Sequence, residues 1–261
     1  MKLNAPLGPG ERVAQYWFKL TPEGSQVVYG VQPSDQFDSC DLIRVGIDGS
    51  PSPVRLAEDV LAGPEIVYGY QFTPEGRQVL FRADLDHDGA LDLYVSPIAR
   101  PGKIVQLTNG RVPTSVEMFR VSRDGSRVVY RATSFGSSRK ALYMVRIDGS
   151  TTPVKLDEGI NIRPDFLISP RGDRVVYHVG LDYTLFGFHP GLLRSVSIKG
   201  GPPVTLDRGS VEEFFTLSDD GKRAVFRATR DNPMVIELYS VALDGSAPPV
   251  KLNDPFLEHD F

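Results

Sequence analysis

The feature that most constrains the fold is a segment of about fifty residues that occurs five times along the 261-residue chain. Each copy begins with an aromatic residue, continues through an apolar residue and Ser or Thr, and then makes a turn that ends in glycine. The turn glycines are Gly24, Gly76, Gly125, Gly172 and Gly221, which recur every 47 to 52 residues. Repeats of this length are typical of architectures in which one small unit cannot bury its apolar face alone and stacks on its neighbours.

Three more apolar runs follow each turn, as in Val128-Val129-Tyr130, Leu142-Tyr143 and Val154-Lys155-Leu156 of the third copy. They are short, rich in β-branched and aromatic residues, and bounded by Gly, Pro and Asp, which indicates strands rather than helices. The run at 128–130 does not alternate with polar residues, so we expect burial on both faces. Sheets that stack on similar neighbours and close radially provide this environment.

The sequence therefore predicts an all-β fold, a β-propeller of five four-stranded antiparallel blades in a single domain, residues 1–261. The blades are expected at about residues 17–57, 69–108, 118–157, 165–207 and 214–253. The aromatic residues that open the copies should be almost completely buried between neighbouring sheets; they are Phe18, Tyr70, Phe119, Phe166 and Phe215.

The turn, the Val-Val-Tyr strand, the Leu-Tyr strand and the Asp-Gly-Ser-x-x-Pro-Val-Lys-Leu segment together resemble the repeat of TolB-type propellers. The propellers of tricorn-like and prolyl-oligopeptidase-like proteins share this repeat. The resemblance extends from Phe18 to Leu252, with Pro101-Gly102 and Gly200-Gly201 in place of the Asp-Gly turn in two copies. It implies the propeller fold and a periplasmic or extracellular location, and it leaves the activity open because such folds carry many unrelated functions.

Charge and composition exclude some classes of function. A net charge of −4 gives no reason to expect nucleic acid, which calls for a basic patch. The sequence has no run of 18 apolar residues that could span a membrane, and Met1–Pro6 lacks the pattern of a signal peptide.

The two ends of the chain repeat the same segment, Lys2-Leu3-Asn4 and Lys251-Leu252-Asn253, each followed by a proline two residues later. Both match the end of a fourth strand. We therefore expect the chain to be an excised stretch of a longer array. Such a stretch either closes as a strained five-bladed ring or covers its exposed end blades by self-association, because uncovered sheets tend to find partners. A natural five-bladed ring is the alternative.

The sharpest local motif is the acidic run that begins at Asp84 and ends at Asp92. Its carboxylates and one backbone carbonyl are expected to bind a structural Ca²⁺ ion, which prefers oxygen ligands. The predicted ligands are Asp84, Asp86, Asp88, the carbonyl of Ala90, and Asp92. The run is similar to the calcium loops of integrin-type FG-GAP blades. An ordinary solvated Asp-rich turn is the alternative.

Two further places are candidates for binding. The residue after each aromatic landmark is expected to line the central channel, and the candidate ligand-binding residues there are Lys19, Gln71, Arg120 and Thr216. They form either a polar pocket or simply the wall of a wet channel. The second place is the loop at 180–190 in the fourth blade, whose aromatic residues either anchor a protein partner or cover a small core of their own.

No catalytic motif accompanies these features. The chain has no Gly-x-Ser-x-Gly elbow, no phosphate-binding glycine loop and no histidine spacing suited to a metal. We predict a non-catalytic scaffold that binds protein or small polar ligands at its loop face and channel. The alternative is the gating propeller of a larger prolyl-oligopeptidase-like peptidase. A metal-dependent lyase or lactonase is less favoured, because converging His and carboxylate residues are missing from the first strands.

Overall fold

The computed structural model describes residues 2–4, 6–35, 39–50, 52–61, 69–100, 102–108, 114–134, 139–157, 162–180, 191–230, 232 and 234–253. Within these ranges all regular secondary structure is β-strand, which confirms the predicted all-β fold. Among the same residues there is no helix with the length and apolar character needed to cross a membrane.

Each sequence repeat contributes strands in the order expected. The first two repeats contain β1 (Glu11–Leu20), β2 (Gln26–Pro33), β3 (Ser39–Gly46), β4 (Val54–Leu61), β5 (Tyr70–Phe72), β6 (Gln78–Ala83), β7 (Asp92–Pro97) and β8 (Val105–Gln106). The third contains β9 (Thr114–Val121), β10 (Arg127–Ser134), β11 (Lys140–Arg146) and β12 (Val154–Asp157). The last two contain β13 (Ile162–Ile168), β14 (Arg174–Gly180), β15 (Gly191–Ser197), β16 (Val204–Leu217), β17 (Arg223–Ala228), β18 (Glu237–Ala242) and β19 (Val250–Lys251).

The paired strands run antiparallel, and most pairs join strands that are consecutive in the chain. One sheet has the order β1-β2-β3-β4-β6-β7-β8 with β5 paired to β6, and the first two repeats join in it through the pair Val60–Ala83. A second sheet has the order β12-β11-β10-β9, and a third runs from β13 to β19. The long strand β16 serves as the last strand of the fourth repeat and the first strand of the fifth.

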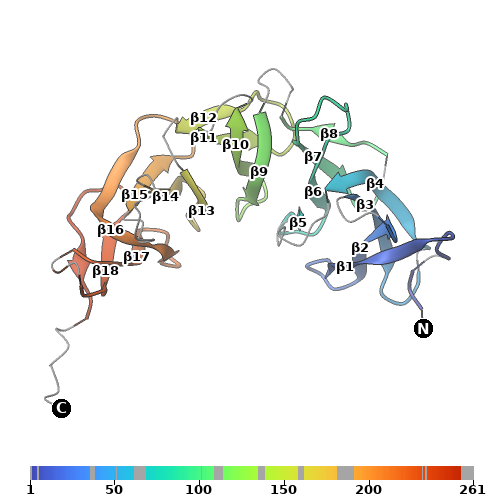
Figure 1. Cartoon of the computed structure of the whole chain (residues 1–261), viewed down its shortest axis with the longest axis horizontal. Helices are drawn as coiled ribbons and strands as arrows, with labels where there is room; N and C mark the ends of the chain where they lie inside the picture. Colours follow the sequence, from blue (N-terminus) through green and yellow to red (C-terminus); the bar gives the residue numbers. More distant parts are fainter. Residues whose placement is uncertain are drawn as a thin grey trace, which may run out of the picture. The chain divides into compact units, whose positions relative to one another are not determined.

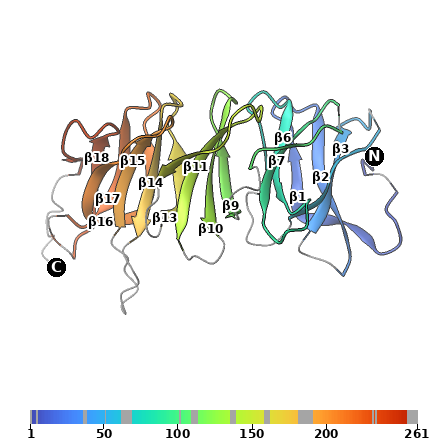
Figure 2. The ribbon, with the colours of Figure 1, turned by 90° about the horizontal axis from the view of Figure 1, so that it is seen from above.

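The chain divides into two compact units, and the division passes through the third repeat. The first unit comprises Met1–Gly136 and Val145–Pro153, and the second comprises Ser137–Met144 and Val154–Phe261. Figure 1 labels the strands of both units, and Figure 2 shows β13 to β18 of the second unit side by side. The predicted single domain and the blade boundaries remain predictions.

Neighbouring repeats share an apolar core within each unit. In the first unit Val28 of β2 lies in one buried cluster with Tyr70, Val79 and Phe81 of the second repeat. The Tyr70 hydroxyl donates a 2.8 Å hydrogen bond to the carbonyl of Val28. In the second unit, residues of the fourth repeat are buried in the same way with Phe226 and others of the fifth repeat. The predicted two-sided burial of the strands is thus present.

The five aromatic landmarks differ in burial. Tyr70, Phe119 and Phe166 are almost completely buried, as predicted, but the prediction of near-complete burial was wrong for Phe215, which is only partly buried. The prediction was wrong for Phe18, whose surface is 67% exposed. The physical reason is that a landmark residue is covered by the preceding repeat, and no described strand precedes β1.

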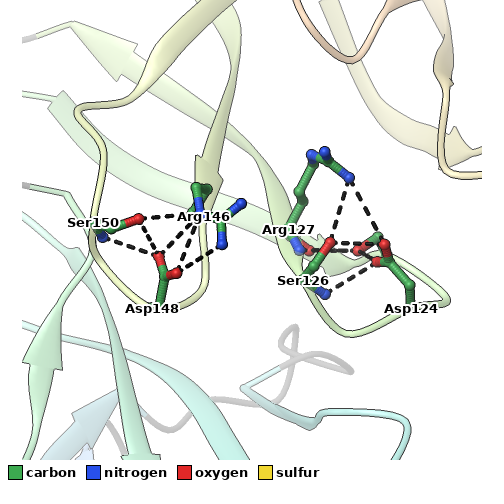
Figure 3. A network of polar contacts seen from close by, with 7 residues as sticks. Asp124, Ser126, Arg127, Arg146, Asp148 and Ser150 are labelled. Atoms are coloured by element: carbon green, nitrogen blue, oxygen red, sulfur yellow. Dashed lines mark hydrogen bonds and ion pairs between the residues drawn. The ribbon is translucent and has the colours of Figure 1, made fainter.

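Short-range hydrogen bonds from serine and arginine to aspartate carboxylates hold the turns (Figure 3). Asp124 accepts from the backbone amide and the hydroxyl of Ser126 at 3.0 and 2.7 Å. Asp148 accepts from the amide and hydroxyl of Ser150 at 3.0 and 2.6 Å, and from the Arg146 guanidinium at 2.8 Å. These hydrogen bonds join residues that are close in sequence, so they stabilise each chain reversal locally.

Candidate functional site

The acidic run forms the loop between β6 and β7 in the first unit. Oxygen atoms of Asp84, Asp86 and Asp88 all lie within 4.8 Å of one another. Asp86 and Asp88 are exposed, and Asp84 is partly buried. The structure therefore brings three of the four predicted carboxylate ligands together at the surface.

Backbone hydrogen bonds curl this loop. The Asp84 carboxylate accepts from the amides of Asp88 and Gly89, both at 3.0 Å. Asp88 in turn accepts from the amide of Ala90 at 2.8 Å. His87 adopts a left-handed backbone with φ of 57°, which is uncommon for a residue with a side chain. Three carboxylates at this separation repel one another, and a hard cation would offset that repulsion.

Asp92, the last predicted ligand, begins β7 and is buried. Its carboxylate accepts a 2.6 Å hydrogen bond from the side-chain amide of Gln106 and another from the hydroxyl of Thr108. Burial raises the pKa of Asp92, its two hydrogen bonds lower it in part, and the charges of Asp86 and Asp88 raise it further. Asp92 is therefore close enough for the charges of Asp86 and Asp88 to affect its pKa, although its carboxylate is not one of the three that converge.

The negative potential of the loop also acts on a neighbouring phenol. Tyr94 of β7 stacks on Phe81, with ring centroids 5.8 Å apart. Burial is the main cause that raises the pKa of Tyr94 to about 12, and the charges of Asp92 and Asp86 add to it. This tyrosine stays protonated at physiological pH, which suits a structural residue.

Two of the predicted channel residues connect neighbouring repeats. The Lys19 ammonium donates to the carbonyl of Tyr70 at 2.9 Å and lies 4.8 Å from the centre of the Tyr70 ring. The Gln71 amide donates to the carbonyl of Phe119, also at 2.9 Å. Burial lowers the pKa of Lys19 from its ordinary value. Both side chains thus connect the first strand of one repeat to the backbone of the next first strand.

The other two members of that predicted set differ from each other in burial. Arg120 of β9 is partly buried, and Thr216 of β16 is exposed. Their part in ligand binding remains a prediction. The aromatic loop at 181–190 lies outside the described residues.

A buried polar cluster joins the second and third repeats, and the sequence analysis did not identify it. Arg82 of β6 donates to the carbonyl of Val116 at 3.1 Å and to that of Glu117. The Glu117 carboxylate forms an ion pair with Arg131 and accepts from the Thr133 hydroxyl. Burial lowers the pKa of Arg82 to about 10, so the guanidinium keeps its charge at neutral pH.

The sequence did contain a signal for this cluster. An arginine directly follows the aromatic residue of the second strand in three repeats, at Arg82, Arg131 and Arg227. Arg227 likewise forms an ion pair with Glu212. In both cases an acidic residue within the first strand of a repeat is neutralised by an arginine of the second strand.

An open groove of about 870 Å³ lies at the turns of the first two repeats. Its charged lining comprises Glu23, Glu75, Arg77, Arg100 and Lys103. Pro97 and Ala99 add apolar surface, and the buried Ile98 lies beneath them. The last two cations flank the Pro-Gly turn that departs from the repeat pattern.

The three basic side chains of the groove are available for a ligand. Arg77, Arg100 and Lys103 are exposed, and they form no ion pair within the described part of the chain. The groove can therefore accept a carboxylate beside an apolar contact.

Comparisons with known proteins place this geometry in a known fold. No protein-family model matches the chain, and no curated protein matches it in sequence. A TolB protein from Agrobacterium tumefaciens matches with a TM-score of 0.50 and 16% identity, over 90% of this chain and 79% of that one. A puromycin-hydrolyzing peptidase from Mycobacterium tuberculosis matches with a TM-score of 0.58 and 17% identity, over 94% of this chain and 39% of that one. An oligogalacturonate lyase in complex with manganese matches with a TM-score of 0.57 and 15% identity, over 87% of this chain and 64% of that one.

These identities are too low to transfer an activity, and they show the fold alone. The chain spans most of the TolB protein but under two thirds of the peptidase and the lyase. The chain therefore has a β-propeller fold, and in this fold it is similar to the TolB protein.

Proposed function

We propose that this chain is a non-catalytic binding module, and that it takes up an acidic segment of a partner protein in the groove at the first two repeats. The observation that carries the proposal is a set of exposed cations beside the apolar Pro97 and Ala99; the cations are Arg77, Arg100 and Lys103. Arginine pairs well with carboxylates, and an apolar floor adds affinity that charge alone does not supply.

We propose the groove rather than the first strands as the ligand site because the polar side chains of the first strands already have partners. Lys19 and Gln71 already donate to the backbone of the next repeat. Glu117 and Glu212 are likewise held in ion pairs with arginine. A ligand at those positions would have to displace these bonds, whereas the groove needs no such exchange.

A peptide array probed with the labelled chain tests this function. Peptides with acidic residues next to an apolar residue are expected to bind, and the triple variant Arg77→Ala, Arg100→Ala, Lys103→Ala should lose most of that binding. Lys222→Ala is the matched control, because Lys222 is the turn residue of the fifth repeat that corresponds to Arg77. Equal binding by the triple variant, or hydrolysis of the peptides, would count against the proposal.

The acidic loop adds a proposed structural Ca²⁺ site to this module. Asp84, Asp86 and Asp88 would supply the first ligands, with the Ala90 carbonyl and Asp92 as the further ligands predicted from the sequence. The close approach of three carboxylate groups supports it. The lyase neighbour was solved with manganese, which also prefers oxygen ligands. The ion would rigidify one loop and take no part in chemistry.

A second candidate function is the gating propeller of a larger peptidase. It is favoured by one observation, the match of nearly the whole chain to 39% of the puromycin-hydrolyzing peptidase. In that case the chain would bind a catalytic domain, and mixing it with such a domain should change the size of the peptides that are cleaved.

A further inference from the structure

The groove at the first two repeats is lined by acidic as well as basic side chains. Glu23 belongs to the turn between β1 and β2, and Glu75 belongs to the turn between β5 and β6. Both side chains are exposed, and neither forms an ion pair within the ranges that the structure describes. Carboxylates and cations therefore share this groove without neutralising one another, so both kinds of charge are available to a ligand.

The turn of the following repeat positions each carboxylate. Gly76 lies against the carboxylate of Glu23, and Gly125 lies against that of Glu75, so closely that a β-carbon on either glycine would collide with the carboxylate. The hydroxyl of Ser25 also donates a 3.2 Å hydrogen bond to Glu23. The two negative charges are thus held on the groove lining, at the boundaries between repeats.

The three cations lie where two turns of the second repeat meet. Arg77 follows the β5–β6 turn, and its carbonyl accepts a 2.9 Å hydrogen bond from the amide of Ile98, directly after β7. This bond holds the start of the β7–β8 turn next to Arg77. The same turn carries Arg100 and Lys103, which complete the basic part of the lining.

The β7–β8 turn lacks the acidic neighbour that the corresponding turn has in the third repeat. There, Asp148 forms a 2.8 Å ion pair with Arg146. The second repeat has Ala99 at the position of Asp148. The positive charge of this turn therefore has no counter-ion of its own, which distinguishes the second repeat from the third.

This mixture of charges disfavours a partner segment that carries negative charge alone. Two carboxylates and three cations give the lining a net charge of only +1. A purely acidic segment would be attracted by the cations and repelled by Glu23 and Glu75, and like charges brought together across an interface oppose binding. A segment that also carries a basic residue meets complementary charge on both parts of the lining.

We propose that the groove selects a bipolar segment of a partner protein, with an acidic residue at the three cations and a lysine or arginine at Glu23 and Glu75. This inference rests on the proposed groove function and specifies the chemistry of the partner. The two glutamates are then the residues that determine specificity, because they discriminate against a segment without a basic residue. All the residues involved belong to the first unit, within Met1–Gly136.

Three synthetic peptides that differ at one position test this specificity. The first contains an acidic residue, an apolar residue and a lysine; the second has glutamine and the third glutamate in place of the lysine. Fluorescence anisotropy at low ionic strength measures their affinities, because salt screens exposed charges. The unmodified chain should bind the lysine peptide about two- to fivefold more tightly than the glutamine peptide, as expected for an exposed ion pair, and the glutamate peptide least tightly.

Substitutions at Glu75 link this preference to the groove. Glu75→Gln should reduce the preference for lysine, and Glu75→Lys should reverse it in favour of the glutamate peptide. Asp219→Asn is the matched control, because Asp219 is an exposed acid in the corresponding turn of the fifth repeat and the charge change is the same. This control should keep the preference of the unmodified chain, and circular dichroism shows that each variant is folded.

The contrary results separate this inference from the function on which it rests. If the acidic peptides bind through Arg77, Arg100 and Lys103 but the lysine gives no gain, the groove function stands and the bipolar ligand is excluded. The same conclusion follows if Glu75→Lys leaves the order of the three peptides unchanged. If binding survives the triple variant at the cations, the groove function itself is contradicted, and this inference with it.

Discussion

Val204 and Gly245 meet at the contact between the fourth and fifth repeats, where a β-carbon on Gly245 would lie 2.4 Å from the Cγ1 atom of Val204. Val105 and Gly149 meet in the same way between the second and third repeats, at 2.9 Å. The glycine of this turn is thus required by the neighbouring repeat as well as by its own backbone.

We expect Gly245→Ala to destabilise the protein more than Gly24→Ala. Both glycines have a positive φ, 71° and 73°, which costs alanine about 1–2 kcal/mol. Only Gly245 faces a stiff β-branched side chain, and relieving that overlap should cost about 1–3 kcal/mol more. Urea denaturation measures the free energy of unfolding of both variants. Equal losses of stability would show that the contact between Gly245 and Val204 does not restrict the residue at position 245.

Calcium should stabilise the chain through the acidic loop. If Asp84, Asp86 and Asp88 bind the ion, free calcium at about 100 times the dissociation constant adds about 2.7 kcal/mol to the free energy of unfolding. Asp86→Ala and Asp88→Ala should abolish this gain, and His87→Ala should keep it. Thermal melts with and without chelator, together with titration calorimetry, measure the effect. An unchanged melting temperature would exclude the site.

The turn at Asp124 should weaken in acid. Hydrogen bonds from Ser122 and Ser126 lower the pKa of Asp124 to about 2, below an unfolded value of about 3.9. A depressed carboxyl pKa contributes stability that is complete above the unfolded value and is lost as the pH falls through the folded value. The stability of Asp124→Asn should therefore depend less on pH between about 4 and 2 than that of the unmodified chain. Urea denaturation across this interval compares the two proteins.

Removing the buried guanidinium of Arg82 should be costly. Arg82→Leu deprives the carbonyls of Val116 and Glu117 of a charged donor, and we expect a loss of about 2–4 kcal/mol. Arg77→Leu, at an exposed position, should change stability by no more than about 0.5 kcal/mol. Denaturation of the two variants side by side is the measurement, and similar losses would show that the cluster is not structural.

Most of the architecture was predictable because the strand signals are local. The apolar run ending at Tyr130 and the turn at Gly125 specify a strand and a reversal wherever they occur. The exposure of Phe18 was not predictable in this way, because the burial of a landmark aromatic depends on a preceding repeat and not on the residue itself. Phe18 occupies the same position in its repeat as Phe119, so the sequence pattern alone did not indicate that the two residues differ in burial.

The candidate sites were predictable only in part, for a similar reason. The convergence of Asp84, Asp86 and Asp88 follows from short-range spacing, which the sequence shows directly. The hydrogen bonds of Asp92 come from Gln106 and Thr108, which reach it across a strand pair. Lys19 likewise bonds to the backbone of Tyr70, a residue of another repeat. Predicting such contacts between repeats requires knowing the register of two segments that are far apart in the sequence.

The uninterrupted strand β16 has a consequence for how the protein opens. Val211 pairs with Gly191 of β15 on one side and with Ala228 of β17 on the other, and its carbonyl lies 3.1 Å from the Nε2 atom of the buried His178. Arrays of repeats often unfold one unit at a time, with a coupling energy between neighbours. Here the fourth and fifth repeats share one continuous strand, which forms hydrogen bonds to β15 and to β17. The two repeats should therefore open together, and their amide protons should exchange with solvent as those of a single cooperative unit.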